Sequence, residues 1–104
     1  MTPHQKDAPD RFVREMSVTP AEWDRALRGA VGDHRLRIDA PGRATVDLTG
    51  GGRLVLRWQA LPPLQIALMR LQRLRVEFAF DGVDAPGRSA FMLHFDRHTQ
   101  RGGG

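Results

Sequence analysis

The stretch from His34 to Ala60, HRLRIDAPGRATVDLTGGGRLVLRWQA, decides the fold of this chain. Its apolar residues alternate with polar ones in three runs, 34–39, 43–49 and 53–60, which Pro-Gly and Gly-Gly-Gly separate. Alternation with a period of two places successive side chains on opposite faces of a strand, and proline and glycine favour turns. The pattern predicts an antiparallel meander with one buried and one solvated face.

A helix is predicted just before this meander. Thr19 is a suitable N-cap, Pro20 occupies the first helical position, and Glu22 completes a capping box. Gly32 is expected to end the helix. Residues 11–18 read as a strand that precedes it. One apolar stripe at helical spacing is formed by Trp23, Ala26, Leu27, Ala30 and Val31.

The residues after the meander give a less uniform pattern. Residues 64–71 fit a short helical turn or an irregular strand equally well, because their apolar residues follow neither period cleanly. Residues 73–80 alternate as a strand. Asp84 is expected to cap a second helix, whose apolar face consists of Phe91, Met92 and Phe95.

These elements predict an α+β fold with the order β-α-β-β-β-(β)-β-α, in which an antiparallel sheet of about five strands carries two helices on one face. The order resembles the half-repeat of TATA-binding proteins and a reduced helix-grip fold. The span Pro62–Phe80 and the tail Phe95–Gly104 resemble parts of a small uncharacterised family of bacterial proteins, a resemblance that implies no activity. We expect a disordered lead at 1–10, a single domain at 11–100 and a flexible Gly-rich tail at 101–104.

Composition narrows the classes of function. The chain has 104 residues and no cysteine, so disulfides, thiolate metal sites and a cysteine nucleophile are excluded, and a cytoplasmic location is expected. No apolar run is long enough to span a membrane, and no membrane partner is expected. The net charge of +4 arises in residues 53–104, because the acidic and basic residues of 1–52 cancel.

The most informative charge feature is a set of outward-facing arginines. No acidic residue lies between Asp47 and Glu77. If the strands at 34–39, 53–60 and 73–80 are neighbours, alternation places a guanidinium-rich surface on the outer face, where it could bind an anionic partner. The candidate binding residues are Arg35, Arg37, Arg53, Arg57, Arg73 and Arg75.

Other residues could in principle bind a metal, act in catalysis or hold a phosphate, but a structural role explains each of them more simply. His94 and His98 lie four residues apart on the second predicted helix, but no further metal ligand accompanies them, and His98 is expected to be part-buried. Ser17 and Ser89 lie outside any nucleophile elbow. A strand rather than a helix follows Gly50-Gly51-Gly52, which therefore reads as a hairpin turn. No catalytic residue, metal or cofactor is predicted.

Three functions from different classes follow. The leading prediction is a non-catalytic interaction module that binds a protein partner as a monomer or homodimer. The second is a nucleic-acid or nucleotide binder that uses the arginine face, although the aromatic residues fall on the core side, away from where bases would stack. The third is a small-molecule binder with a pocket between sheet and helices, which a cavity of roughly 300 Å3 or more would favour.

Overall fold

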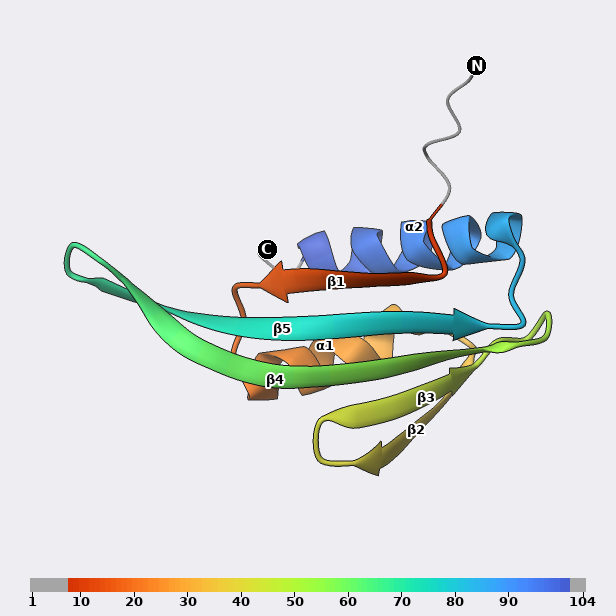
Figure 1. Ribbon diagram of the computed structural model, residues 1–104, viewed down its shortest axis with the longest axis horizontal. Coiled ribbons are helices and arrows are strands. Elements are labelled where there is room, and N and C mark those ends of the chain that lie inside the picture. The colour runs from red at the N-terminus through yellow and green to blue at the C-terminus, as the bar shows by residue number, and fades with distance from the viewer. Residues whose placement is uncertain (1–7, 102–104) are drawn as a thin grey trace, which may run out of the picture.

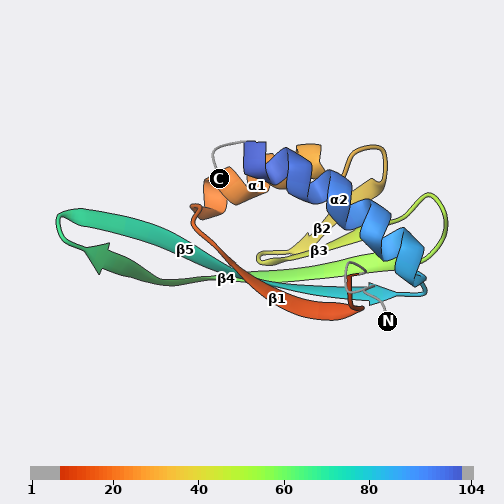
Figure 2. The same ribbon diagram turned by 90° about the horizontal axis from the view of Figure 1, so that it is seen from above.

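The computed structural model describes residues 8–101. Five antiparallel strands form one sheet with the spatial order β1-β5-β4-β3-β2, and both helices cover the same face of it (Figures 1 and 2). The predicted α+β class is therefore confirmed. The elements are β1 (Arg11–Met16), α1 (Pro20–Ala30), β2 (Arg35–Ala40), β3 (Arg43–Asp47), β4 (Arg53–Ile66), β5 (Met69–Asp81) and α2 (Ala85–Arg101).

The first helix begins as the sequence predicts. The Thr19 side chain accepts a hydrogen bond from the Glu22 N–H at 3.1 Å, and Glu22 Oε1 accepts one from the Thr19 N–H at 2.8 Å, which completes the capping box. Gly32, with a φ of +63°, follows the helix where an L side chain would be strained. The second helix begins at Ala85, and Asp84 accepts a hydrogen bond from the Gly87 N–H at 2.9 Å.

The core lies between the sheet and the helices. Trp23 and Leu27 of α1 and Phe95 of α2 have no exposed surface, and they pack on the inward side chains of the three central strands. All seven Phe and Trp residues of the chain belong to this core or pack against it: Phe12, Trp23, Trp58, Phe78, Phe80, Phe91 and Phe95.

Two parts of the structure differ from the expectation. Residues 64–71 are not a helical turn. They are irregular strand, the second alternative, except for a turn at 67–68, and they form the tip of one long hairpin made by β4 and β5 instead of a separate strand. Strand β3 lies between β2 and β4, so the runs 34–39 and 53–60 are not neighbours. A meander necessarily inserts its middle strand there, and the arginines of β2 consequently lie one strand further out.

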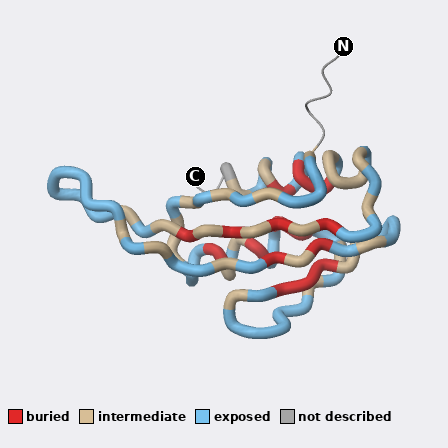
Figure 3. The backbone as a smooth tube through the Cα atoms, viewed as in Figure 1, coloured by how far each residue is buried: buried red, intermediate tan, exposed pale blue. Residues whose placement is uncertain are grey.

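The long hairpin extends beyond the rest of the molecule. β1 pairs with β5 only as far as Leu74, and β3 pairs with β4 only as far as Arg57. Residues 61–72, which we call the hairpin arm, therefore form a two-stranded ribbon (Figure 1), and its tip is exposed (Figure 3). Pro62 and Pro63 oppose the single residue Gln72, as in a β-bulge.

The two ends of the chain lie only partly within the described residues. Residues 1–7 and 102–104, where disorder and a flexible tail were predicted, lie outside them. The last residues of the expected lead have defined contacts. The Ala8 N–H donates to Ser89 Oγ at 3.1 Å, and the Ala8 carbonyl accepts from Arg88 Nε at 2.9 Å.

Candidate interaction face on the outer side of the sheet

The strand register places all six predicted arginines on the outer face of the sheet, opposite the helices. Leu54, Leu56, Val76 and Phe78 are buried beneath the helices, so their immediate neighbours along each strand point outward. Arg57 is directly opposite Glu77 on β5, and Arg53 is directly opposite Asp81. Across β3, Arg35 and Arg53 both pair with Asp47.

Half of the predicted set is already neutralised by neighbouring carboxylates. Arg37 lies 3.5 Å from Asp47 and 4.0 Å from Asp39. Arg75 forms an ion pair with Glu77 two residues along the same strand. These partners reduce the attraction of Arg37 and Arg75 for an added anion, because each guanidinium already has a counter-charge.

Arg73 has a structural role at the base of the hairpin arm. Its Nε and Nη2 donate to the Pro62 carbonyl at 3.2 and 2.9 Å, while Nη1 donates to Glu15 Oε1 at 3.1 Å. The planar fork of arginine suits this convergent arrangement. Arg73 therefore joins β1, the bulge of β4 and β5, and contributes least to a binding surface.

The other predicted arginines, Arg35, Arg53 and Arg57, form no ion pair with any residue that the structure describes. Arg11 and Arg43, which the sequence interpretation did not single out, share this property. Arg43 begins β3 directly opposite Arg57 on β4. Like charges directly opposite each other on adjacent strands are destabilising, so the Arg43–Arg57 pair is the feature of this face that most favours an anion.

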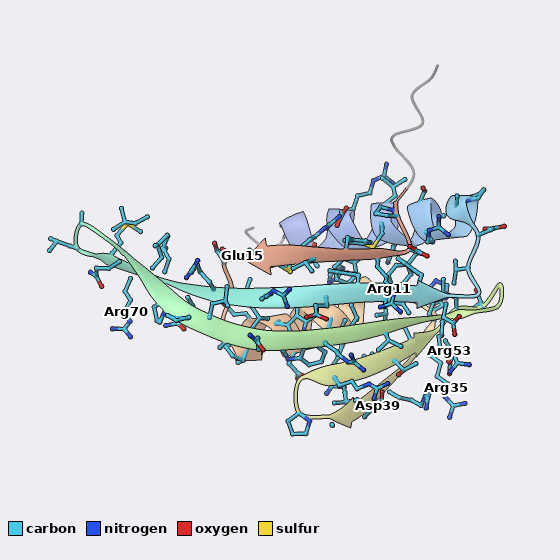
Figure 4. The ribbon with its side chains drawn as sticks, in the orientation of Figure 1. Arg11, Glu15, Arg35, Asp39, Arg53 and Arg70 are labelled. Carbon is cyan, nitrogen blue, oxygen red and sulfur yellow. The ribbon has the colours of Figure 1, made fainter. Side chains whose placement is uncertain are left out.

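Arg11 and Arg43 could have been identified from the sequence by the same alternation that identified the other arginines. Arg11 and Arg43 are the first residues of their strands, and alternation assigns each of them to the outer face. Figure 4 shows Arg11, Arg35 and Arg53 near the same end of the sheet, with Arg70 on the hairpin arm.

Four arginines border a shallow groove of about 800 Å3 on the outer face. Arg11, Arg43, Arg57 and Arg75 line it together with the apolar side chains of Val13 and Val55. Asp10, Glu77 and Asp81 also line it, so the groove carries both signs of charge, and its arginines exceed its carboxylates by one. Such a surface can form bidentate hydrogen bonds with carboxylates or phosphates.

A second, smaller pocket lies at the same end of the sheet but on the helix side, next to the turn that follows β5. Its volume is about 440 Å3, and it is formed by two glycine turns, the first turns of α2 and the end of β3. His34 Nδ1 accepts a hydrogen bond from the Thr49 N–H at 3.0 Å, which leaves Nε2 to carry the proton of a neutral ring. The pocket is lined by His34, Leu48, Gly50, Gly51, Gly82, Val83, Asp84, Gly87, Ala90, Phe91 and His94.

The two histidines considered as metal ligands, His94 and His98, pack against the first helix. His94 lies over Gly32, and His98 lies over Gly29, so both rings pack against the end of α1. Both residues are exposed, whereas His98 was expected to be part-buried; it lies at the rim of the helix pair and not within it. Among residues 8–101, no three His, Asp or Glu side chains are placed to hold a metal ion. Neither helix in that range is long and apolar enough to cross a membrane.

Comparison with known proteins adds no further information about this face. The chain matches no protein-family model, and its comparison with curated protein sequences finds no match. The arrangement of the residues themselves is therefore the basis for assigning a function.

Proposed function

We propose that this chain is a non-catalytic interaction module that binds an acidic protein partner through the outer face of its sheet. The observation that carries the proposal is the Arg43–Arg57 pair, two unpaired guanidinium groups directly opposite each other on the groove. A partner carboxylate between them would replace a repulsive contact with two charge-assisted hydrogen bonds.

Two features favour a protein over a nucleic acid as the partner. Every Phe and Trp residue is in the core or packs on it. Phe12, Phe78 and Phe80 also line the groove, but alternation directs their rings toward the helices, so the outer face offers no ring on which a base could stack. Carboxylates alternate with the arginines along the face, as at Asp47, Glu77 and Asp81. A continuous row of phosphates would meet these carboxylates, whereas a protein surface can match a mosaic of both signs.

The test is site-specific photo-crosslinking in the cells that express the full chain. A photoreactive residue in place of Val55 would lie in the groove, between Arg57 and Arg53 on β4. We expect one discrete adduct that protease destroys and nuclease does not. The double variant Arg43→Glu/Arg57→Glu should abolish this adduct.

The matched control is Arg25→Glu/Arg97→Glu. It changes the net charge by the same amount, but its residues are exposed on α1 and α2, on the helix side of the molecule. The control should keep the adduct. An adduct lost equally in both double variants would reflect net charge alone and would contradict the proposal.

Nucleic acid is tested directly by titration of the 15N-labelled protein. Single-stranded RNA of mixed sequence and a sulfated polysaccharide are added at low and at near-physiological salt. We expect both sets of amide shifts to disappear together as the salt concentration rises. Shifts on β3 to β5 that persist for RNA alone at near-physiological salt would replace the protein partner with a nucleic acid.

The pocket at the end of the core supports a second candidate function, the binding of a small molecule. Its volume of about 440 Å3 lies within the range of ligand pockets. Leu48, Val83 and Phe91 offer an apolar wall, and the two imidazoles of His34 and His94 offer polar contacts. A compact apolar molecule with one hydrogen-bond acceptor matches this lining, and acetophenone, which has a single carbonyl oxygen, is a suitable probe.

Gly50→Leu provides the test of this pocket. Gly50 lines the pocket, and a Cβ added there meets no atom within 4 Å, so leucine has space at this position and we expect it to obstruct the pocket. Acetophenone should shift the amides of residues 83–94 in the natural protein and in Arg43→Glu/Arg57→Glu, and should not shift them in Gly50→Leu. Shifts that persist in Gly50→Leu would exclude the pocket as the site.

A further inference from the structure

The hairpin arm presents its large apolar side chains on one face. Leu64 is directly opposite Leu71, and Ile66 is directly opposite Met69, so alternation aligns these two pairs on the same side of the ribbon. Ile66 is 50% exposed and Met69 is 61% exposed. Leu68, in the turn, is 99% exposed. The arm therefore carries an uncovered apolar surface, whose tip appears in Figure 3.

The β-bulge is what brings these residues to one side. Before the bulge, the outward residues of β4 are the odd-numbered ones, such as Arg57 and Gln59. The extra residue at Pro62-Pro63 inverts the alternation, so that Leu64 and Ile66 point outward with Met69 and Leu71 of β5. Without the bulge, the apolar residues of the two strands could not share a face.

A two-stranded ribbon of this kind is only marginally stable when it stands alone in water. Its base is nevertheless held in place, because the Arg73 guanidinium binds both the Pro62 carbonyl and Glu15. An apolar ribbon fixed at its base and uncovered along its face is typical of an element that another surface covers.

Association through the β4 edge of the arm is blocked. Pro62 and Pro63 have no N–H to donate to an added strand, and proline at such positions protects an edge. Burial of the apolar side chains requires contact through the face of the ribbon, where Leu64, Ile66 and Met69 project.

The apolar face of the arm can pack against the same face of a second copy without opposing like charges. It carries no charged residue, because Arg70 pairs with Gln65 on the reverse side of the ribbon. The outer face of the main sheet would oppose arginines to arginines if two copies met there. The other large exposed apolar residues, Val13, Ile38 and Leu93, lie singly on separate elements of the described chain.

We propose that two copies of this chain associate through face-to-face packing of their hairpin arms. This surface is separate from the arginine groove, and the inference does not depend on the acidic partner. The contact is small compared with the roughly 800 Å2 per partner of a standard interface. We therefore expect a weak dimer, with a dissociation constant on the order of 10–100 μM.

Sedimentation equilibrium of the full chain measures this association. Between 5 μM and 1 mM, concentrations chosen to span the range of about 10–100 μM, the average mass should rise from 11.7 kDa toward twice that value. Added salt should strengthen the dimer, because it screens the repulsion between two chains of charge +4 and leaves the apolar contact intact. Binding of an acidic partner should show the opposite dependence on salt.

The variant Ile66→Thr/Met69→Thr removes the apolar contact and keeps strand propensity through β-branched side chains. We expect its dissociation constant to rise at least tenfold. The control Val13→Thr/Ile38→Thr makes the same kind of change at exposed apolar residues of β1 and β2, and it should dimerise normally. Amide spectra establish whether the arm remains paired in each variant.

Paramagnetic labelling locates the contact without any change to the apolar face. The chain has no cysteine, so Gln72→Cys introduces one attachment site at an exposed residue of the arm. Mixed with 15N-labelled natural protein, this labelled variant should broaden the amides of 64–71. A label attached through Arg25→Cys on α1 should leave those amides sharp.

Three results would overturn the proposal. The first is a mass that stays at 11.7 kDa up to 1 mM. The second is a dimer that survives Ile66→Thr/Met69→Thr and is lost in Val13→Thr/Ile38→Thr. The third is a monomer whose arm amides shift on vesicles of anionic phospholipid, which would make a lipid surface the occupant. None of these results bears on the crosslink at Val55, so the two proposals fail separately.

Discussion

At the scale of single residues, Arg14 joins the sheet to the second helix. Its guanidinium forms a two-pronged ion pair with Asp96 of α2, and it lies 5.4 Å from the centroid of the Phe12 ring and 5.6 Å from that of Phe78. Arg14 is the polar residue within the otherwise apolar inner side of β1. Its long apolar stem and its charged head fit the border between the core and the solvent.

Asp96→Asn tests how much the Arg14–Asp96 ion pair contributes to the stability of the fold. We expect the free energy of unfolding to fall by about 0.5–1 kcal/mol, because the pair is partly exposed and solvent screens it. The control is Asp24→Asn, which removes a more exposed pair with Arg28 on α1 and should cost about 0.3 kcal/mol. Chemical denaturation measures both, and equal effects would show that the partial burial of the Arg14–Asp96 pair adds nothing to its strength.

Gly29 of α1 lies directly beneath the imidazole of His98 on α2. A Cβ added there would lie 2.5 Å from His98 Nε2, so Gly29→Ala must displace the imidazole. Alanine favours a helix over glycine by about 1 kcal/mol. We expect the single variant to be nearly neutral in thermal unfolding, because the two effects offset each other.

The double variant Gly29→Ala/His98→Ala separates these effects. Without the imidazole, the alanine should raise stability over His98→Ala alone by about 0.5–1 kcal/mol. If Gly29→Ala is equally stabilising with and without His98, the close approach of the ring to α1 has no energetic consequence.

At the scale of elements, Arg73 determines how firmly the hairpin arm is held. Arg73→Ala removes the hydrogen bonds to the Pro62 carbonyl and to Glu15. We expect amide hydrogen exchange at residues 64–71 to accelerate about tenfold, while the core strands exchange as before. The control is Arg70→Ala, because Arg70 lies on the arm and its side chain forms no hydrogen bond or ion pair within residues 8–101. Equal acceleration in both variants would contradict this role.

The elements also show where prediction from sequence succeeds. Local signals determined both helices, because Thr19 and Asp84 cap them and the apolar stripe of α1 has a clear period. The arm was not predicted, because its alternation changes phase at Pro62 and Pro63. A bulge is a property of the pairing between two strands, and a single strand read alone gives no sign of the residue that it opposes.

At the scale of the whole molecule, alternation placed every candidate arginine on the correct face but could not rank them. Arg73 and Arg75 differ little in sequence context from Arg53 and Arg57. The structure shows that carboxylates engage the first two, Glu15 from the neighbouring strand and Glu77 along β5 itself. Arg57 lies opposite Arg43 on one side and opposite Glu77 on the other, and it forms an ion pair with neither. Which arginines are free therefore depends on side-chain geometry that alternation along one strand does not give.

The last prediction links stability to the proposed binding. Arg43→Glu places a carboxylate directly opposite Arg57 and replaces a repulsive cross-strand pair with an attractive one. We expect the free energy of unfolding to rise by about 0.2–1 kcal/mol, while the crosslink at Val55 is lost. Arg25→Glu should change neither quantity appreciably.

A variant that gains stability and loses its partner would show that the natural Arg43–Arg57 pair lowers the stability of the sheet but is needed for binding. Such a cost is expected of a binding surface and not of a structural one. An unchanged or lower stability would mean that the two guanidinium groups already avoid each other in solution, and the repulsion that supports the binding proposal would be absent.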